Sequence, residues 1–438
     1  MANESDEIEE VEHDAWVDSM MKRAQSIGSR PSQTDPCTIY RLPSNIRQGD
    51  VNAYEPHIIS IGPYHRGKQS LQAMEERKWH YLHALLTRNP DHSLAHYIKE
   101  IQPLEDRARS CYSEKINLRS HRFVEMMVLD GCFIIELFLN IDGKRAVEVG
   151  PTYRNERMVP LISHDMLLLE NQLPFFILQR LFELVNRSSS YSLVDLALNF
   201  FDHNLPRNEA IQPSKVVHHL LHLFHSHIIP APFERSQEVG PTTAFDRRLI
   251  LPPRSIPSMA EILQAGILFK KKKAGSFLDI TFSDLVIKIP ALSIYDSTTN
   301  TLFRNMIAFE QCYPKSGTYF TSYAIFMHCM LQTTKDVMVF KQCRIIEHWL
   351  GSDEEVVHLF NQICKGLTVD FKDNYLLGLI NHVAEVCERN WHTWQARMMR
   401  DYFRSPWSIL QIEATTLALV FTLVQASLAL FAYYRPRP

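Results

Sequence analysis

Two carboxylates stand five positions apart in an otherwise apolar stretch and are the first candidates for acid–base chemistry. Asp165 and Glu170 flank a run of leucines, and Asn171 and Gln172 follow directly. Buried carboxylates and amides must be hydrogen-bonded, so these side chains either stabilise a break between helices or line a site. No nucleophile or metal-binding pattern accompanies them. The pattern therefore favours a structural polar network.

Glu310 and Gln311 repeat this combination in a second apolar stretch, and we expect both to be buried scaffold residues. A rival interpretation is an enzyme that uses Asp165, Glu170 and Glu310 in one buried pocket. It requires the three carboxylates to converge on a concave site that solvent reaches.

Histidines crowd the stretch between positions 218 and 227. His218, His222 and His225 share one face of the expected helix and could offer three imidazoles to a transition metal. No carboxylate or cysteine nearby in the sequence completes the set, and a half-buried helix explains the pattern equally well. They are weak metal candidates, and we expect no cofactor.

The segment from Gly62 to Lys68 spells the G-x-x-x-x-G-K of a phosphate-binding loop. The next residue is Gln69, where such a loop needs Ser or Thr to hold magnesium. Pro63 also lacks the backbone N–H that a phosphate cradle would use. We therefore expect a structural turn and no nucleotide. Other catalytic motifs, such as G-x-S-x-G and H-E-x-x-H, do not occur in the sequence, which predicts a protein that is not an enzyme.

Composition indicates a large, mainly helical body. The 438 residues are 45% hydrophobic and 22% charged with only 14 glycines, and sheets usually consume more turn glycines than this. The formal net charge of -3 provides no strong field to gather nucleic acid, so no nucleic-acid partner is expected.

The pattern along the chain divides it into three parts. Residues 1–38 are acidic and polar, typical of a disordered arm. Residues 39–405 read as the helical body, with a small β-hairpin region near 278–296, where apolar residues alternate. Residues 230–257 hold six prolines and predict a long irregular loop. Residues 406–438 are the third part.

This third part predicts a membrane anchor. Ala414 to Tyr434 carries no charge, and its 21 positions match the hydrocarbon core of a bilayer. Trp407, Tyr433 and Tyr434 stand where interfacial aromatics belong, and Arg435 opens a short basic tail. We expect one transmembrane helix that contacts the lipid bilayer through 414–434. Because the N-terminus shows no signal-peptide pattern, the body is expected in the cytosol, with the span in the plasma membrane.

Phrases along the whole chain resemble the plant family called domain of unknown function 247. The most specific ones read Ser-Ile-Gly-Pro-Tyr-His and Asp-Met-Leu-Leu-Leu-Glu-Asn-Gln-Leu-Pro-Phe-Phe, and others are Phe-Arg-Asn and Ala-Phe-Glu-Gln-Cys; they occupy residues 60–65, 165–176, 303–305 and 308–312. The resemblance implies a plant-specific, mostly helical protein, usually membrane-anchored, for which no enzymatic activity is established. Some grass members are candidate pollen-side self-incompatibility determinants.

The sequence departs from the family pattern at three positions. Asp284 stands where the family often has Gly before Leu285, which puts a tight turn there in doubt. Arg344 replaces another common glycine, and Glu413 lies where small residues usually open the span. None of these departures argues against the family's fold.

Taken together, the sequence predicts a membrane-anchored interaction or signalling protein with an unknown protein partner. The 230–257 loop is the best candidate for the contact surface. The alternatives are a self-incompatibility determinant with its body outside the cell, and the buried-carboxylate enzyme.

Overall fold

The computed structural model describes residues 16–23, 37–47, 49–141, 158–185, 192–201, 216–229, 256–367, 374–389 and 406–434, with only the backbone described at 45, 296–297, 406–413 and 431–434. The expected loop at 230–257 lies outside this set apart from its last two residues. Within the expected arm, residues 16–23 are helical. The chain is mainly helical, as the sequence predicts.

A first group of helices packs around α6 (Ser120–Ile141), whose residues from Phe123 to Leu139 are all buried apart from Glu125. A helix that is apolar on every side is stable only when other elements surround it. Its neighbours are α3 (Gln72–Arg88), α4 (Leu94–Ile101), α5 (Glu105–Ser110), α8 (Phe175–Val185) and α9 (Leu193–Phe201). α7 (Met158–Met166) precedes α8, which begins directly after Pro174 because proline is favoured where a helix starts.

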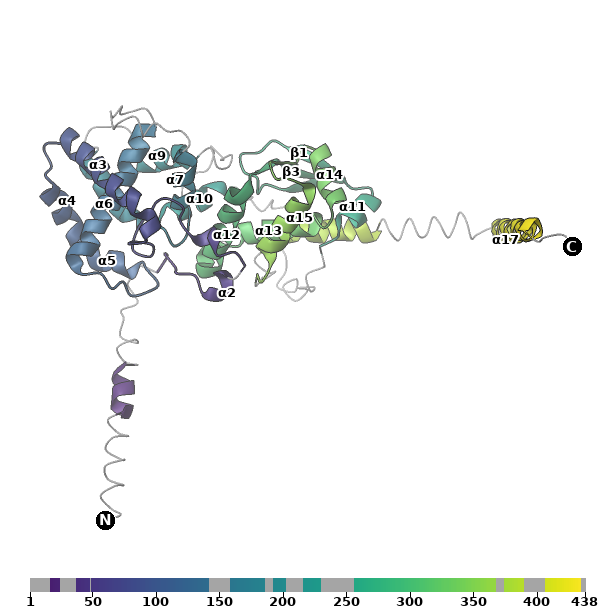
Figure 1. Cartoon of the computed structure of the whole chain (residues 1–438), viewed down its shortest axis with the longest axis horizontal. Helices are drawn as coiled ribbons and strands as arrows, with labels where there is room; N and C mark the ends of the chain where they lie inside the picture. The colour runs from purple at the N-terminus through teal and green to yellow at the C-terminus, as the bar shows by residue number, and fades with distance from the viewer. Residues whose placement is uncertain are drawn as a thin grey trace, which may run out of the picture.

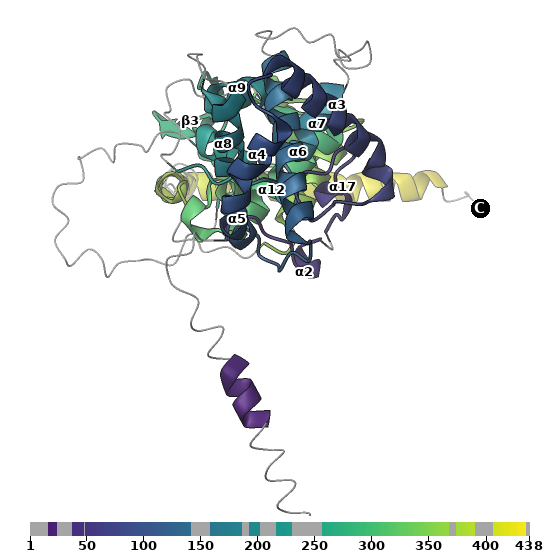
Figure 2. The ribbon, with the colours of Figure 1, turned by 90° about the vertical axis from the view of Figure 1, so that its left-hand side faces the viewer.

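A second group contains α13 (Tyr319–Met330), α14 (Thr334–Gln342) and α15 (Asp353–Cys364), together with α11 (Met259–Gln264) and two small sheets. Figure 1 shows the two groups at opposite ends of the body, with α10 (Leu220–Ile228) and α12 (Asp296–Cys312) between them. The turned view of Figure 2 looks onto the first group, with α4, α5 and α6 toward the viewer.

The strand region contains the expected hairpin and more. β2 (Thr281–Ser283) pairs antiparallel with β3 (Val286–Pro290), and β1 (Leu268–Lys272) pairs parallel with the other edge of β3, so that Leu268 lies opposite Val286. β4 (Leu292–Ile294) leaves this sheet and pairs in parallel with β5 (Ile346–His348). The tight turn that the sequence puts in doubt is present. Asp284 and Leu285 both have positive φ, 53° and 58°, as a two-residue hairpin turn requires.

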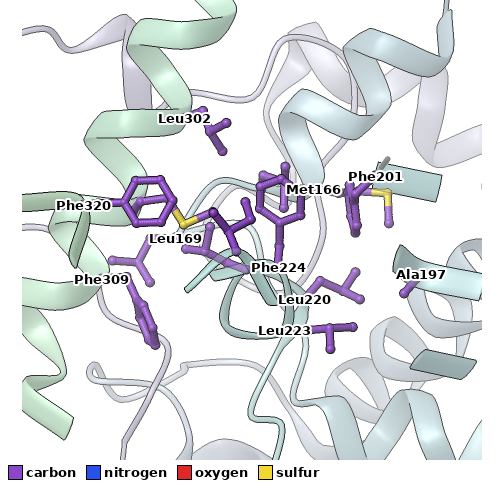
Figure 3. Packing of buried hydrophobic residues seen from close by; sticks show 14 of the residues in the cluster. Met166, Leu169, Ala197, Phe201, Leu220, Leu223, Phe224, Leu302, Phe309 and Phe320 are labelled. Atoms are coloured by element: carbon purple, nitrogen blue, oxygen red, sulfur yellow. The ribbon is translucent and has the colours of Figure 1, made fainter. Parts of the chain in front are cut away.

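One continuous hydrophobic core joins the two groups, running in sequence from Ile39 to Val383. Figure 3 shows its centre, where Phe224 and Leu223 of α10 lie between Phe201 of α9 on one side and Phe309 of α12 on the other. The rings of Phe201 and Phe224 are 5.7 Å apart at their centroids. The middle of the body is therefore packed by side chains of α9, α10 and α12.

The membrane prediction is wrong. The chain is helical over the expected span, in α17 (Pro406–Tyr434), but no helix within the described residues is both long and apolar enough to cross a membrane. Five polar residues, Thr415, Thr416, Thr422, Gln425 and Ser427, interrupt the apolar sequence of the expected span. The transmembrane part of the expected fold and the single-pass plasma-membrane localisation built on it are corrected accordingly. The proposed interfacial side chains of Trp407, Tyr433, Tyr434 and Arg435 lie outside what the structure describes.

Candidate functional site

Several of the buried polar side chains bind the backbone of one segment, residues 57–62, which we call the strap. Asp165 is fully buried, and its carboxylate accepts hydrogen bonds from the backbone N–H groups of His57, Ile58 and Ile59 at 2.7–2.9 Å. Backbone N–H groups aimed at one point form an anion-binding site. Here the anion is a carboxylate of the protein itself, more than a hundred residues along the chain.

Asn171 and Gln172, which belong to the same sequence motif as Asp165, also bind backbone groups. Asn171 accepts from the N–H of Ile61 at 2.6 Å and donates to the carbonyl of Ile59 at 3.0 Å. Gln172 donates to the carbonyls of Met166 and Leu168 and accepts from the N–H of Leu221, which ties the break between α7 and α8 to α10. These amides satisfy backbone groups that the break would otherwise leave unpaired.

The strap ends at the segment that imitates a phosphate loop, and its first glycine is in close contact with the core. The N–H of Gly62 donates to Asp130 at 2.9 Å. Gly62 has φ of +74°, and a Cβ atom there would lie 2.6 Å from the carbonyl oxygen of Gln172, so only glycine fits. Lys78, fully buried, forms an ion pair with the same Asp130 at 2.6 Å. The segment therefore directs its backbone donor inward, to a protein carboxylate.

Glu170 lies at the centre of a second charged cluster. Its carboxylate is 1% exposed, accepts from Arg47 Nη2 at 2.7 Å and from the N–H of Leu42 at 2.8 Å, and lies 3.8 Å from Nε2 of His65. Burial, and secondarily the charge of Lys68, lower the pKa of His65 to about 4. His65 is thus neutral near pH 7, and Lys68 is paired with Glu55.

Glu310 has a separate set of partners in the middle of the body. It accepts from the N–H groups of Phe320 and Thr321 and from the Thr321 hydroxyl, and it lies 2.9 Å from Nε2 of His225. It therefore binds the N-terminal turn of α13, where a negative charge is stabilised by the helix dipole. Gln311 is half-buried beside it.

These contacts test the alternative interpretation, an enzyme that uses the three carboxylates in one pocket. Asp165, Glu170 and Glu310 share no hydrogen-bond partner among the described residues, and each accepts from at least two donors. A general acid or base needs a lone pair or a proton directed at a substrate. The donors surrounding these carboxylates hold parts of the fold together.

The two histidine arrangements follow the same pattern. Nε2 of His218 lies 3.1 Å from the Tyr313 hydroxyl, His222 Nδ1 accepts from a backbone N–H, and His225 faces Glu310. The rings of His218 and His222 stack at a centroid distance of 4.8 Å, but His225 faces Glu310, and within the described residues these three histidines do not form a metal-binding group. A set that the sequence missed, His57, His164 and Asp165, places three possible ligand atoms within 4.8 Å of one another. However, the two imidazoles are stacked in parallel at 4.4 Å and the carboxylate is already bonded to the strap.

An open cavity of about 480 Å³ lies where three distant segments meet. Its lining comes from the chain before η1 (Asn52–Tyr54), from α12, and from Leu350 together with α15. Arg304 of α12 lines it, although the residue as a whole is only 6% exposed. In the sequence, Arg304 stands out only as part of the Phe-Arg-Asn motif. The cavity could not be predicted, because the residues that build it stand far apart in the chain.

A pair of exposed aromatic side chains stands next to this cavity. Trp349 is 74% exposed and Tyr295 is 48% exposed, and their rings are parallel within 7° at a centroid distance of 6.4 Å. The backbone holds them in place, since the N–H of Trp349 donates to the carbonyl of Ile294 at 2.9 Å. Leu350, the residue after Trp349, lines the cavity.

Comparison with known proteins assigns the chain to a family. The family model of domain of unknown function 247, described as a plant protein of unknown function, matches residues 39–421. The chain belongs to this family. A relative from Arabidopsis thaliana, UPF0481 protein At3g47200, is 30% identical over 417 residues, covering 91% of this chain and 87% of the relative. Putative UPF0481 protein At3g02645 from the same plant is 24% identical over 490 residues, covering 91% of each chain. No solved structure matches.

The motifs shared with domain of unknown function 247 correspond to hydrogen-bonded parts of the core. The phrases at 60–65 and 165–176 are the strap end and the side chains that bind it, and the phrase at 308–312 contains the carboxylate that binds α13. The family's most specific sequence phrases are thus the parts of the fold that pair polar groups inside the core.

Proposed function

We propose that this member of the domain of unknown function 247 family is a recognition protein without catalysis, which binds another protein through the surface around Trp349 and Tyr295. The stacked aromatic pair is the observation that carries the proposal. A tryptophan that leaves most of its surface in water gives up hydrophobic stabilisation that burial would supply. Interface hot spots are enriched in tryptophan and tyrosine, which bring a large contact area with little loss of side-chain freedom.

The hydrogen bonding of the buried carboxylates supports the part of this proposal that expects no catalysis. The carboxylates that invite a catalytic interpretation bind backbone N–H groups of the strap, of the first residues of the body and of α13. A recognition protein needs a rigid scaffold that presents an exposed surface, and such internal bonding supplies rigidity.

Photo-cross-linking tests the proposal. The full chain would carry p-benzoylphenylalanine at position 349 and be expressed in plant tissue, with the same group at Met338, which is 52% exposed on α14, as the matched control. We expect a discrete cross-linked partner from position 349 only. Trp349→Ala, folded by circular dichroism, should compete with the cross-link at least about 30-fold less well than the wild type, as loss of a hot spot implies.

Two results would contradict the proposal. One is the same set of cross-linked proteins from positions 349 and 338. The other is undiminished competition by Trp349→Ala, which would place the contact surface elsewhere on the molecule.

A further inference from the structure

Among the residues that the structure describes, the guanidinium of Arg304 has no carboxylate partner. Nε donates to Asn300 Oδ1 at 2.9 Å, Nη2 donates to the carbonyl of Gln362 at 3.0 Å, and the guanidinium also hydrogen-bonds the side chain of buried Tyr54. Within the described part of the chain, no aspartate or glutamate lies within ion-pair distance of it. A buried charge is costly unless it is paired, so an arginine this buried beside an open cavity is suited to binding an anionic group that comes from outside.

The geometry around Arg304 fixes its position. Asn300 bridges Arg304 to Asp50, because its Nδ2 donates to Asp50 Oδ2 at 2.6 Å. On the opposite side, a Cβ atom on Gly49 would lie 3.0 Å from Arg304 Nη1, so the backbone approaches the guanidinium closely there. A guanidinium held this way presents its remaining donors with little further loss of conformational freedom.

The other charges of the cavity decide which anions fit. Asp50, Glu355 and His358 also line it. Phosphate or a dicarboxylate would be attracted to one guanidinium and repelled by two carboxylates. A ligand with one carboxylate and one ammonium group complements both signs of charge. Leu350 and Leu359 add an apolar wall for the rest of such a ligand.

We propose that this cavity is a binding site for a small zwitterion, an apolar amino acid or short peptide, whose carboxylate pairs with Arg304 and whose ammonium group pairs with Asp50 and Glu355. The cavity volume of about 480 Å³ lies in the usual range of small-molecule sites. The site is distinct from the protein-binding surface of Trp349 and Tyr295 and does not depend on it.

Calorimetric titration of the full chain with three related probes tests the site without any mutation. The probes are L-leucine, 4-methylpentanoate, which lacks the ammonium group, and 3-methylbutylamine, which lacks the carboxylate. We expect leucine to bind at least about tenfold more tightly than either analogue, since each loses one charge-assisted contact. Equal or tighter binding of either analogue, or no heat from leucine at any soluble concentration, would overturn the proposal.

Variants then assign the contacts. Arg304→Gln should weaken leucine binding about tenfold and leave 3-methylbutylamine unchanged, whereas Glu355→Gln should weaken both leucine and the amine. Glu354→Gln is the matched control, since Glu354 is exposed on the same turn of α15 but does not line the cavity. If Arg304→Gln fails to fold, Glu355→Gln and the three probes still decide the matter. Unchanged leucine affinity in Glu355→Gln, or in folded Arg304→Gln, would refute the assignment.

Discussion

Removing the charge of Asp165 tests the strap directly. Asp165→Asn keeps the shape of the side chain but replaces one oxygen by an NH₂ group. Oδ1 accepts from the N–H of His57 at 2.9 Å and lies 3.1 Å from Nδ1 of His164, and Oδ2 accepts from Ile58 and Ile59. Whichever way the amide turns, at least one backbone N–H faces a donor.

The expected cost follows from these bonds. A hydrogen bond to a buried charge contributes about 1.5–3 kcal/mol, and a buried donor left without a partner costs about 1–3 kcal/mol. One lost acceptor and the lost charge on the remaining bonds give a decrease of about 3–5 kcal/mol in the free energy of unfolding. This is a large fraction of the roughly 5–15 kcal/mol of a typical protein.

Urea denaturation followed by circular dichroism measures this change, and hydrogen exchange reports whether the amides of residues 57–59 lose protection. Asp91→Asn is the control, because Asp91 is exposed, and it should change stability by less than about 0.5 kcal/mol. A loss below about 1 kcal/mol in Asp165→Asn, with those amides still protected, would refute the view that this carboxylate holds the strap.

Two further predictions concern pH and backbone conformation. Burial lowers the pKa of His65 to about 4 in the folded state, so below about pH 6.5 the unfolded chain takes up a proton that the folded one does not, and stability falls as the pH decreases toward 4. Between pH 7 and 4.5, the free energy of unfolding measured by urea denaturation should decrease by about 2–3 kcal/mol less in His65→Gln than in the wild type. Identical pH dependence in the two proteins would refute this. Arg344, which follows α14 with φ of 55°, occupies the left-handed position after a helix that glycine favours, so Arg344→Gly should raise the unfolding free energy by about 1 kcal/mol while Arg344→Ala should not. Equal thermal midpoints for the glycine and alanine variants would contradict it.

Local sequence signals predicted the local parts of this fold. The fully apolar stretch of α6 is typical of a central helix, and Pro174 stands directly before α8, where proline is favoured. Alternation near 278–296 indicated the hairpin, but not β1, which pairs with β3 from outside the alternating stretch. The two departures from glycine, Asp284 and Arg344, both fall at positive φ, so the backbone keeps the family's turns without the residue that suits them best.

What the sequence could not supply is the partner of each polar side chain. Asp165, Asn171 and Asp130 bind backbone N–H groups of the strap, and every residue except proline has such a group. No residue type marks those partners. The cavity around Arg304 was missed for a similar reason, since its walls come from three segments that only the tertiary fold brings together. The membrane prediction was based on the length, the absence of charge and the flanking aromatics of 414–434, and no helix within the described residues is long and apolar enough to cross a membrane.

The strap also constrains the order in which the protein can fold. Its N–H groups bind side chains 106 to 110 residues further along the chain at Asp165 and Asn171. During synthesis at about 5–20 residues per second, the segment around Ile59 therefore waits roughly 5–20 seconds before its acceptors exist. Such long-range closure slows folding. We expect chains that end before Asn171 to leave residues 57–62 open to proteases, so the N-terminal part of the body is stabilised only after its central part has been made.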